Sequence, residues 1–460
     1  MSSSRRGFLR AAAALPASAL AQKRPARPNL LFLLTDDQRW DALGSMGNPV
    51  IKTPNLDRLA SQGTVFRNNF CTTAICMSSR ASIFTGLHLR AHGINTFDAP
   101  LKPADFDRSY PALLRAAGYR TGFIGKWGVG NAMPADRFDY FKGFPGQGRY
   151  FEKDSDEHLT NRQGEQAAEF LDGCRPSQPW CLSISFKAPH AQDEDPRQFL
   201  YDPALASLYR DVDVPVPQSF DRLPDFLRAT EGRRRFQARF DTPAHFQEMV
   251  KAYYRLVTGV DIVVGQLRQA LADRDFESNT VIVFTSDNGD FLGEHGMADK
   301  WLMYEESIRT PLIVYDPRQP AAGRRRTEMT LNIDLAPTLL DLAGAPVPAC
   351  MQGRSLRPLF GAGKPSAWRR EWYYEHRFEY QGRIPPSEGI RTADWKYIRY
   401  VAEFPEREEL YDLRRDPTEE HNLAAAPAHR AKLAELRGRW RAWSDALGRW
   451  SPAARWRDPA

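Results

Sequence analysis

Short apolar runs recur along the chain and alternate with segments of helical periodicity. The runs are rich in apolar and β-branched residues and are bounded by Gly, Pro or Asp, which is typical of buried strands. They cover residues 30–34, 121–125, 181–186, 281–285 and 312–315. Because these strand patterns alternate with helical ones, we expect an α/β fold in which helices cover both faces of a large, mostly parallel sheet.

The helical patterns between these runs have clear ends. Thr53 and Pro54 have the pattern of an N-cap and a first helical residue, and Gly63 ends that helix. Apolar positions mostly three and four residues apart predict a long helix over residues 244–272. Asp261 falls on the apolar stripe of this helix, and we interpret it as a packed, hydrogen-bonded residue rather than as part of a site.

Residues 193–241 interrupt the alternation. The segment is rich in Pro and charged residues, with Arg233-Arg234-Arg235 near its end, and its periodicity is weak. We therefore expect loops and short helices. Such an insertion either shapes a substrate cleft or is a solvated surface loop, and the sequence favours neither.

The pattern changes again near Ala345. Strand patterns at residues 371–375, 388–392, 395–401 and 409–412 predict a small antiparallel sheet. Four apolar residues at helical spacing predict the packing face of a final helix: Leu436, Trp440, Trp443 and Leu447. We expect a large domain over residues 28–345, a small domain with this sheet and helix over residues 346–447, and a tail over residues 448–460.

The first 21 residues have the pattern of a signal peptide. Residues 4–10, Ser-Arg-Arg-Gly-Phe-Leu-Arg, match a twin-arginine signal, and a mainly apolar stretch over residues 11–20 follows. That stretch is too short to span a bilayer, and residues 19–21 form a small-x-small cleavage site. We expect the twin-arginine machinery to export the protein to the periplasm or the medium; the alternative is a frayed basic N-terminus.

The composition is that of a globular protein, with 42% hydrophobic and 26% charged residues. The formal net charge of +6 suits an anionic substrate but is too small to indicate a nucleic-acid partner. There are five cysteines. If Cys76 is modified, the other four allow three disulfide connectivities in an exported protein, although a buried free thiol at Cys181 is at least as well supported.

Polar residues follow two of the predicted strands. Asp36 and Asp37 come directly after residues 30–34, and Asp287 and Asn288 come after residues 281–285. Either pair alone is a common turn pattern. Ligands bind beyond the carboxyl ends of parallel strands, and adjacent carboxylates there repel each other unless a cation holds them. With no Cys or His donor nearby in the sequence, these hard oxygen ligands favour Ca²⁺ or Mg²⁺ over zinc.

The stretch over residues 76–86, Cys-Met-Ser-Ser-Arg-Ala-Ser-Ile-Phe-Thr-Gly, resembles the signature of the sulfatase family, an alkaline-phosphatase-like fold. Ser78 stands where that family usually has Pro. A lone Cys is more often a small buried residue. The resemblance implies that a formylglycine-generating enzyme oxidises Cys76 to formylglycine, whose hydrate attacks the sulfur of a sulfate ester, and that Arg80 contributes positive charge.

Three further elements resemble the same family. Gly125-Lys126-Trp127-Gly128 implies that Lys126 contacts the sulfate, but Gly128 stands where the family has a His that helps to expel sulfate in the second step. Ala188-Pro189-His190 implies that His190 binds the sulfate and protonates the leaving alcohol. Residues 293–312 imply that Lys300 is a second sulfate-binding cation, with His295 beside the site.

The resemblance covers residues 28–423 and predicts the whole site. The catalytic residues would be Cys76, Arg80, Lys126, His190 and Lys300, and the metal ligands would be Asp36, Asp37, Cys76, Asp287 and Asn288. Gly128 leaves the second-step base open, with a water or another His such as His92 as candidates.

The predicted function is a sulfuric ester hydrolase of the arylsulfatase type, acting on a sulfated small molecule or polysaccharide. Two alternatives stay open. One is a phosphoester or phosphonate ester hydrolase of the same superfamily, with the same nucleophile and metal. The other is a catalytically silent protein that binds sulfated glycans through an unmodified Cys76.

Overall fold

The computed structural model describes residues 27–220, 222–319, 323–363, 365, 367–378, 380, 382–401 and 407–448. The signal peptide predicted at residues 1–21 and the tail beyond residue 448 lie outside the described residues.

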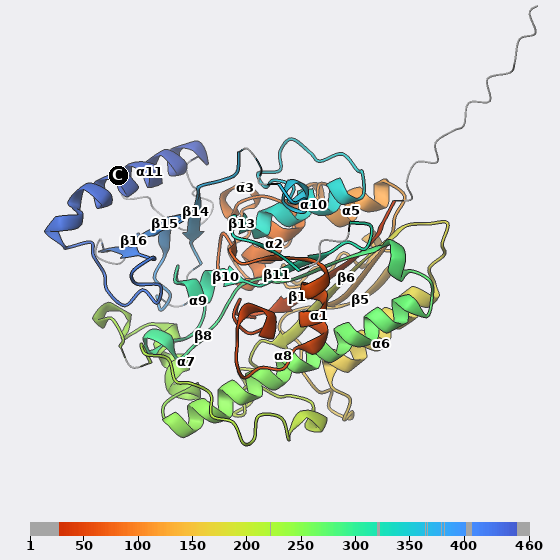
Figure 1. Ribbon diagram of the computed structural model, residues 1–460, viewed down its shortest axis with the longest axis horizontal. Coiled ribbons are helices and arrows are strands. Elements are labelled where there is room, and N and C mark those ends of the chain that lie inside the picture. The colour runs from red at the N-terminus through yellow and green to blue at the C-terminus, as the bar shows by residue number, and fades with distance from the viewer. Residues whose placement is uncertain are drawn as a thin grey trace, which may run out of the picture.

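An eight-stranded sheet lies at the centre of the molecule, in the order β12-β2-β11-β7-β1-β6-β4-β5 (Figure 1). Its strands are β1 (Asn29–Asp36), β2 (Thr64–Phe66), β4 (Arg120–Lys126), β5 (Tyr140–Phe144), β6 (Trp180–Pro189), β7 (Thr280–Ser286), β11 (Leu312–Tyr315) and β12 (Arg324–Arg326). β1 pairs in parallel with β6 and β7, and β4 pairs in parallel with β5 and β6. β11 runs antiparallel to β7 and β2. The predicted mostly parallel sheet is confirmed.

Side chains of the central strand pack into separate cores on the two faces of the sheet. Leu31 and Leu33 belong to one core, and Leu30, Phe32 and Leu34 belong to the other. A strand buried on both faces has no polar face, which explains why residues 30–34 form an unbroken apolar run.

Helices cover both faces (Figure 1). One layer contains α1 (Pro54–Gln62), α6 (Leu159–Asp172) and α8 (Pro243–Ala272), and the other contains α2 (Cys76–Thr85), α5 (Tyr110–Ala116) and α10 (Leu335–Leu342). The shorter helices are α3 (Leu89–His92), α4 (Pro103–Phe106), α7 (Glu231–Arg239) and α9 (Glu305–Ile308). Two small sheets join β3 (Asn69–Phe70) to β10 (Arg309–Thr310) and β13 (Thr330–Leu331), and β8 (Phe291–Leu292) to β9 (Ala298–Asp299).

The start of α1 depends on a residue 206 positions away. Thr53 stands at the N-cap position, as predicted, but its side chain makes no capping bond, because its hydroxyl accepts from the Gly44 amide. Instead, the Asp261 carboxylate accepts from the amides of Asn55, at 3.3 Å, and Leu56, at 2.7 Å. Asp261 is therefore a hydrogen-bonded structural residue, as predicted.

The C-terminal region is a second layer of structure beside the large sheet (Figure 1). β14 (Glu371–His376), β15 (Ser387–Thr392), β16 (Trp395–Tyr400) and β17 (Arg407–Asp412) form an antiparallel meander. α11 (Arg430–Ala446) packs on it through Leu436, Trp440, Trp443 and Leu447. The predicted sheet and helix packing face are confirmed.

All five cysteines lie in the described part of the chain and carry free thiols. The disulfide pairings considered from the sequence are therefore absent, and Cys181 is buried, as expected for a thiol in a central strand. No described helix has the length and apolar character needed to cross a membrane.

Candidate active site

The predicted site residues gather at one edge of the large sheet. Asp36 ends β1, Lys126 ends β4, His190 follows β6, and Asp287 follows β7. The carboxyl ends of neighbouring parallel strands share an edge, so these residues meet although they lie far apart in sequence. The sheet itself thus positions most of the site.

Two cations surround Asp36. The Lys126 ammonium is hydrogen-bonded to the Asp36 carboxylate, and Arg80, on α2, lies 3.4 Å from it. Arg80 Nε also donates to Asp287 at 2.9 Å. Burial alone would raise the pKa of Asp36, but the attraction of Lys126, Arg80 and Lys300 lowers it below its ordinary value. Asp36 is therefore ionised at neutral pH.

Asp37 has a different environment. Lys300 Nζ lies 2.6 Å from both carboxylate oxygens, and Asn288 Nδ2 donates to Oδ1 at 2.7 Å. Burial raises the pKa of Asp37, Lys300 opposes this, and repulsion from Asp36 and other carboxylates brings the pKa to about 7. Adjacent carboxylates thus differ in charge state at neutral pH.

Cys76 is the first residue of α2 and only 2% exposed. Burial raises the pKa of its thiol, against the attraction of Lys126 and Lys300. Since the thiolate is the nucleophilic form of cysteine, the unmodified residue is a poor nucleophile at neutral pH.

The donor set around Asp36 and Asp37 suits a hard divalent cation. In the described part of the chain, the buried Asp36 Oδ1 and Asn288 Oδ1 have no hydrogen-bond partner, so two oxygen ligands lack a cation or donor. His190, which is distant in sequence, also lies beside these carboxylates. Asp36, Asp37 and His190 bring potential ligand atoms within 4.8 Å of one another, because β6 ends beside β1.

His190 presents one nitrogen to the site. Its Nδ1 lies 2.5 Å from the Ala191 carbonyl and must carry the hydrogen of that bond, while Nε2 lies 3.5 Å from Asp37 Oδ2. Burial and the positive charges of Lys300, Lys126 and Lys187 lower the pKa of His190 well below its ordinary value. The imidazole is therefore neutral, and its Nε2 can accept a proton.

Two departures from the family pattern have structural explanations. Gly128 has φ +70°, and a Cβ there would lie 2.6 Å from Arg80 Cδ, so the Arg80 side chain fills the space that a larger residue would need. Ser78 is buried, and its hydroxyl donates to the Ile94 carbonyl at 2.7 Å.

His92 does not replace the missing base. Its Nδ1 accepts from the Ile94 amide at 3.0 Å, so Nε2 carries the proton and bonds the Ser82 hydroxyl at 3.1 Å. Burial and the nearby His88 lower the pKa of His92 to about 3. Both nitrogens of His92 are occupied by structural bonds, so this residue is not free to act as that base.

Sequence reasoning missed four polar residues of the site. Gln147 Oε1 accepts from Lys126 Nζ at 2.6 Å, and Ser185 Oγ accepts from Arg80. Lys300 Nζ lies 3.3 Å from Asp299 Oδ1. Burial and repulsion from Asp37 and Asp299 raise the pKa of Asp290 well above its ordinary value. Asp299 lies inside the motif at residues 293–312, and Asp290 comes two residues after Asn288, so their acidic character was a usable signal, whereas Gln147 had none.

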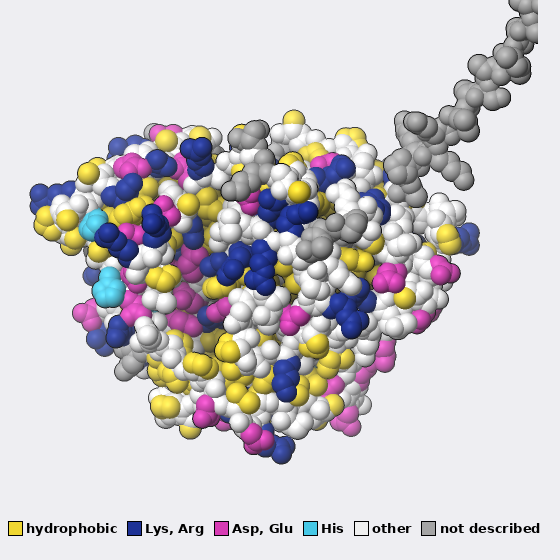
Figure 2. Space-filling view, in the orientation of Figure 1, with side chains coloured by type: hydrophobic (Ala, Val, Ile, Leu, Met, Phe, Trp, Pro, Cys, Tyr) yellow, Lys and Arg dark blue, Asp and Glu magenta, His cyan; other side chains and the backbone are white. Residues whose placement is uncertain are grey.

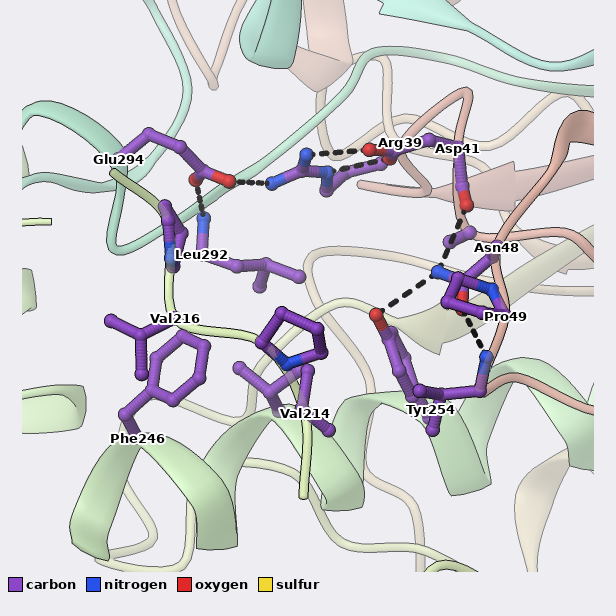
Figure 3. Close-up of a pocket in the computed structure, with 15 residues that line it drawn as sticks. Arg39, Asp41, Asn48, Pro49, Val214, Val216, Phe246, Tyr254, Leu292 and Glu294 are labelled. Atoms are coloured by element: carbon purple, nitrogen blue, oxygen red, sulfur yellow. Dashed lines mark hydrogen bonds and ion pairs between the residues drawn. The ribbon is translucent and has the colours of Figure 1, made fainter. Parts of the chain in front are cut away.

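Several cavities in the described part of the chain lie apart from these residues. One, of about 260 Å³, is lined by apolar side chains of α8 and by Arg39, which bridges Asp41 and Glu294 (Figure 3). Another, of about 410 Å³, is lined by His295 and four glutamates, Glu408, Glu409, Glu419 and Glu420. Acidic side chains also gather in a hollow beside the C-terminal region in Figure 2. His295 therefore faces this acidic cavity.

Comparisons with known proteins match most of the chain to one family. A family model described as Sulfatase matches residues 28–345, and one described as N-sulphoglucosamine sulphohydrolase, C-terminal, matches residues 293–445. The chain is 31% identical to an N-acetylglucosamine-6-O-sulfatase of Bacteroides thetaiotaomicron, over 93% of this chain and 88% of that protein.

Solved structures extend the similarity to the fold. A protein in complex with its substrate D-glucosamine-2-N,6-O-disulfate superposes with a TM-score of 0.82 at 28% identity, covering 92% of this chain and 98% of that one. A phosphonate monoester hydrolase of Agrobacterium radiobacter gives a TM-score of 0.76 at 23% identity, covering 92% and 96%. At that identity, the second similarity shows the shared fold alone.

Proposed function

This chain belongs to the sulfatase family of hydrolases, and on that premise we propose that it hydrolyses sulfate esters of a sulfated carbohydrate. The observation that carries the proposal is the pairing of Lys126 with Asp36 and of Lys300 with Asp37 beside Cys76. Two fixed cations at one strand edge suit a tetrahedral anion. The carbohydrate class rests on the relative that is an N-acetylglucosamine-6-O-sulfatase.

Cys76 supplies the nucleophile after conversion to formylglycine by a formylglycine-generating enzyme. The high pKa of its buried thiol supports this, because the unmodified side chain is protonated. Lys126 and Lys300 hold the sulfate oxygens. Arg80, whose pKa is raised by Asp287 and Asp36 against the effect of burial, keeps its positive charge beside the nucleophile.

A divalent metal, Ca²⁺ or else Mg²⁺, would be held by Asp36, Asp37, Asp287 and Asn288, with position 76 completing the set. When bound, it supplies positive charge that stabilises the transferring group. The unpartnered oxygens of Asp36 and Asn288 support this assignment. Dialysis against a chelator should abolish turnover, and Ca²⁺ should restore it better than Mg²⁺ or Zn²⁺ if the site prefers hard oxygen ligands.

His190 donates a proton from Nε2 to the leaving alcohol oxygen. The neutral imidazole must first gain that proton, and the negative charge of a bound sulfate favours this gain. Because Arg80 fills the space beside Gly128 and His92 is bound elsewhere, a water is the candidate base for the second step.

The test uses protein co-expressed with a formylglycine-generating enzyme. Peptide mass spectrometry across Cys76 should show formylglycine, and sulfate should be released from N-acetylglucosamine 6-sulfate and from an aryl sulfate, with Cys76→Ala inactive. Faster turnover of aryl phosphate or phosphonate esters would favour the phosphoesterase alternative. Retention of sulfated glycans without turnover by protein with an intact thiol would favour the binding-protein alternative.

The protein is exported to the periplasm or the medium by the twin-arginine machinery. The support is the signal pattern at residues 4–10. Replacing both arginines, Arg5→Lys and Arg6→Lys, should retain the protein in the cytoplasm. Unchanged export of that variant would contradict the assignment.

A further inference from the structure

Two arginines on α7 bind the same pair of aspartates. Arg235 Nη1 lies 2.8 Å from Asp193 Oδ2 and 2.5 Å from Asp299 Oδ2. Arg239, one turn later, places Nη2 2.6 Å from Asp193 Oδ1 and Nη1 3.4 Å from Asp299 Oδ2. The side chains are four residues apart and so lie on one face of the helix. α7 therefore joins two distant segments through four charged groups.

Both segments carry residues of the active site. Asp193 follows His190 by three residues. Asp299 directly precedes Lys300, whose Nζ is 3.3 Å from Asp299 and 2.6 Å from Asp37. The arginines thus fix the segment of the predicted acid against the segment of the second sulfate-binding cation.

The backbone around Lys300 needs such support. Asp299 has φ +76° and Trp301 has φ +83°, a region that residues other than Gly rarely adopt and that is a true outlier for a bulky side chain. Such residues persist only where the surroundings hold them. The Arg235 guanidinium lies 5.4 Å from the centre of the Trp301 ring and binds Asp299, so it holds both neighbours of Lys300.

We propose that Arg235, assisted by Arg239, is a positioning residue that holds Lys300 at Asp37 and sets its place relative to His190. Arg235 acts through Asp299 and Trp301, which flank Lys300, and not by touching the substrate. The insertion at residues 193–241, whose purpose the sequence left open, thereby becomes part of the catalytic apparatus. This inference rests on the proposed function for its kinetic test, but its structural test does not.

The kinetic test compares Arg235→Ala, Arg235→Lys and a matched control, Arg234→Ala. Arg234 lies on the same helix, is more than half exposed, and pairs with Glu231. Misplacing a catalytic group by about 1 Å can cost on the order of 100-fold, so kcat/KM of Arg235→Ala should fall about 10- to 100-fold. Arg235→Lys should recover part of the loss, and Arg234→Ala should stay within about twofold, with melting temperatures showing that each variant is folded.

A double-mutant cycle separates positioning from a general structural effect. If Arg235 acts through Lys300, Arg235→Ala should cost less than about twofold in a Lys300→Ala background, because the group that it positions is gone. The inhibition constant of inorganic sulfate should rise in Arg235→Ala in parallel with the loss of kcat/KM. Additive losses, or unchanged sulfate inhibition, would overturn the proposal.

A crystal structure of Arg235→Ala gives a readout that is independent of turnover. A Lys300 ammonium displaced from Asp37 supports the proposal, and an unmoved one overturns it. If Arg235→Ala does not fold, Arg235→Gln and Arg235→Lys serve in the same measurements. A wild-type protein that hydrolyses no sulfate ester would refute the proposed function, and the crystal structure would still decide whether Arg235 positions Lys300.

Discussion

Asp36 and Asp37 are neighbours in sequence, but the two halves of the site around them are built differently. The partners of Asp36 come from regular structure, since Lys126 ends β4 and Arg80 lies in α2. The chief partner of Asp37 is Lys300, which follows the two-residue strand β9.

The two aspartates also differ in their pKa values. The pKa of Asp36 is below its ordinary value, because its cations outweigh the effect of burial, whereas the pKa of Asp37 is about 7, because burial and neighbouring carboxylates outweigh Lys300. A strand end therefore places a residue, but the elements packed around it decide its protonation. The residues around Asp36 form the sheet half of the site, and their positions follow from the order of the strands. The residues around Asp37 form the loop half, and the position of Lys300 there depends on contacts from α7.

The largest effect should follow from removing either lysine. Lys126→Ala and Lys300→Ala should each lower kcat/KM by about 10²–10³, because each removes one fixed cation from the transferring group. Steady-state kinetics with an aryl sulfate measures the loss. Lys142→Ala, which changes an exposed lysine on β5, is the control and should be near wild type. A loss below tenfold for one lysine would mean that the other half of the site carries the reaction.

Replacing Asp36 and replacing Asp37 should lower the stability of the protein by different amounts when both are measured in the presence of a chelator. Asp36→Asn should lower the free energy of unfolding by about 3–5 kcal/mol, because it leaves the buried Lys126 ammonium without its carboxylate and removes one of the two carboxylates beside Arg80. Asp37→Asn should cost less, since Asp37 is partly protonated at neutral pH. Urea unfolding measures both values.

The stability of the same two variants relative to wild type should depend differently on pH. A carboxyl whose folded pKa is raised from 3.8 to about 7 destabilises the native state increasingly as pH rises between those values. Asp37→Asn should therefore gain stability relative to wild type between pH 5 and pH 7. The stabilising contribution of Asp36, whose pKa is lowered, is already complete there, so the Asp36→Asn difference should stay flat. Parallel curves for both variants would refute the contrast.

Gly128→His restores the usual family residue and tests the sheet half. It should destabilise the protein by about 1–3 kcal/mol, because the side chain collides with Arg80 and the residue needs a positive φ. Activity should fall rather than rise. Gly128→Ala separates the backbone effect from the size of the ring in the same thermal unfolding assay. A His variant that is as stable as wild type and more active would show that Arg80 moves easily.

The smallest effect should come from Gln147→Ala. Gln147 lies in a turn between Gly146 and Gly148, both with positive φ, and its side chain accepts from Lys126. Loss of one hydrogen bond to a charged group is worth about 1.5–3 kcal/mol, and the remaining bond from Lys126 to Asp36 should limit the loss of kcat/KM to roughly tenfold. Gln147→Glu should retain the contact, and its kcat/KM should exceed that of the Ala variant.

The sequence predicted the sheet half well because its signals are local. An apolar run followed by Asp36 or Asp287 indicates both a buried strand and the polar residue at its end. The resemblance to a family supplied Cys76, Lys126, His190 and Lys300, which the structure brings together, while their catalytic functions remain predictions.

The parts that sequence reasoning missed depend on pairs far apart in the chain. Asp261 binds α1 amides about 205 residues away, Arg235 binds Asp299, and Gln147 reaches Lys126 through a turn. No periodicity or motif encodes such pairs. His190 lies beside Asp36 and Asp37 because the strand order places β6 beside β1, which distance along the sequence does not reveal.

The burial of Cys76 sets an order of events during biosynthesis. A side chain that is 2% exposed, at the start of a helix packed beneath the sheet edge, is out of reach of another enzyme's active site once the domain has folded. The chemical identity of position 76 is therefore settled while the chain is still being made or is unfolded. If the proposed conversion of Cys76 to formylglycine is required, a molecule that folds with its thiol intact should stay inactive. The active fraction of a preparation should then report the supply of modifying enzyme during translation, and later treatment of folded protein should not raise it.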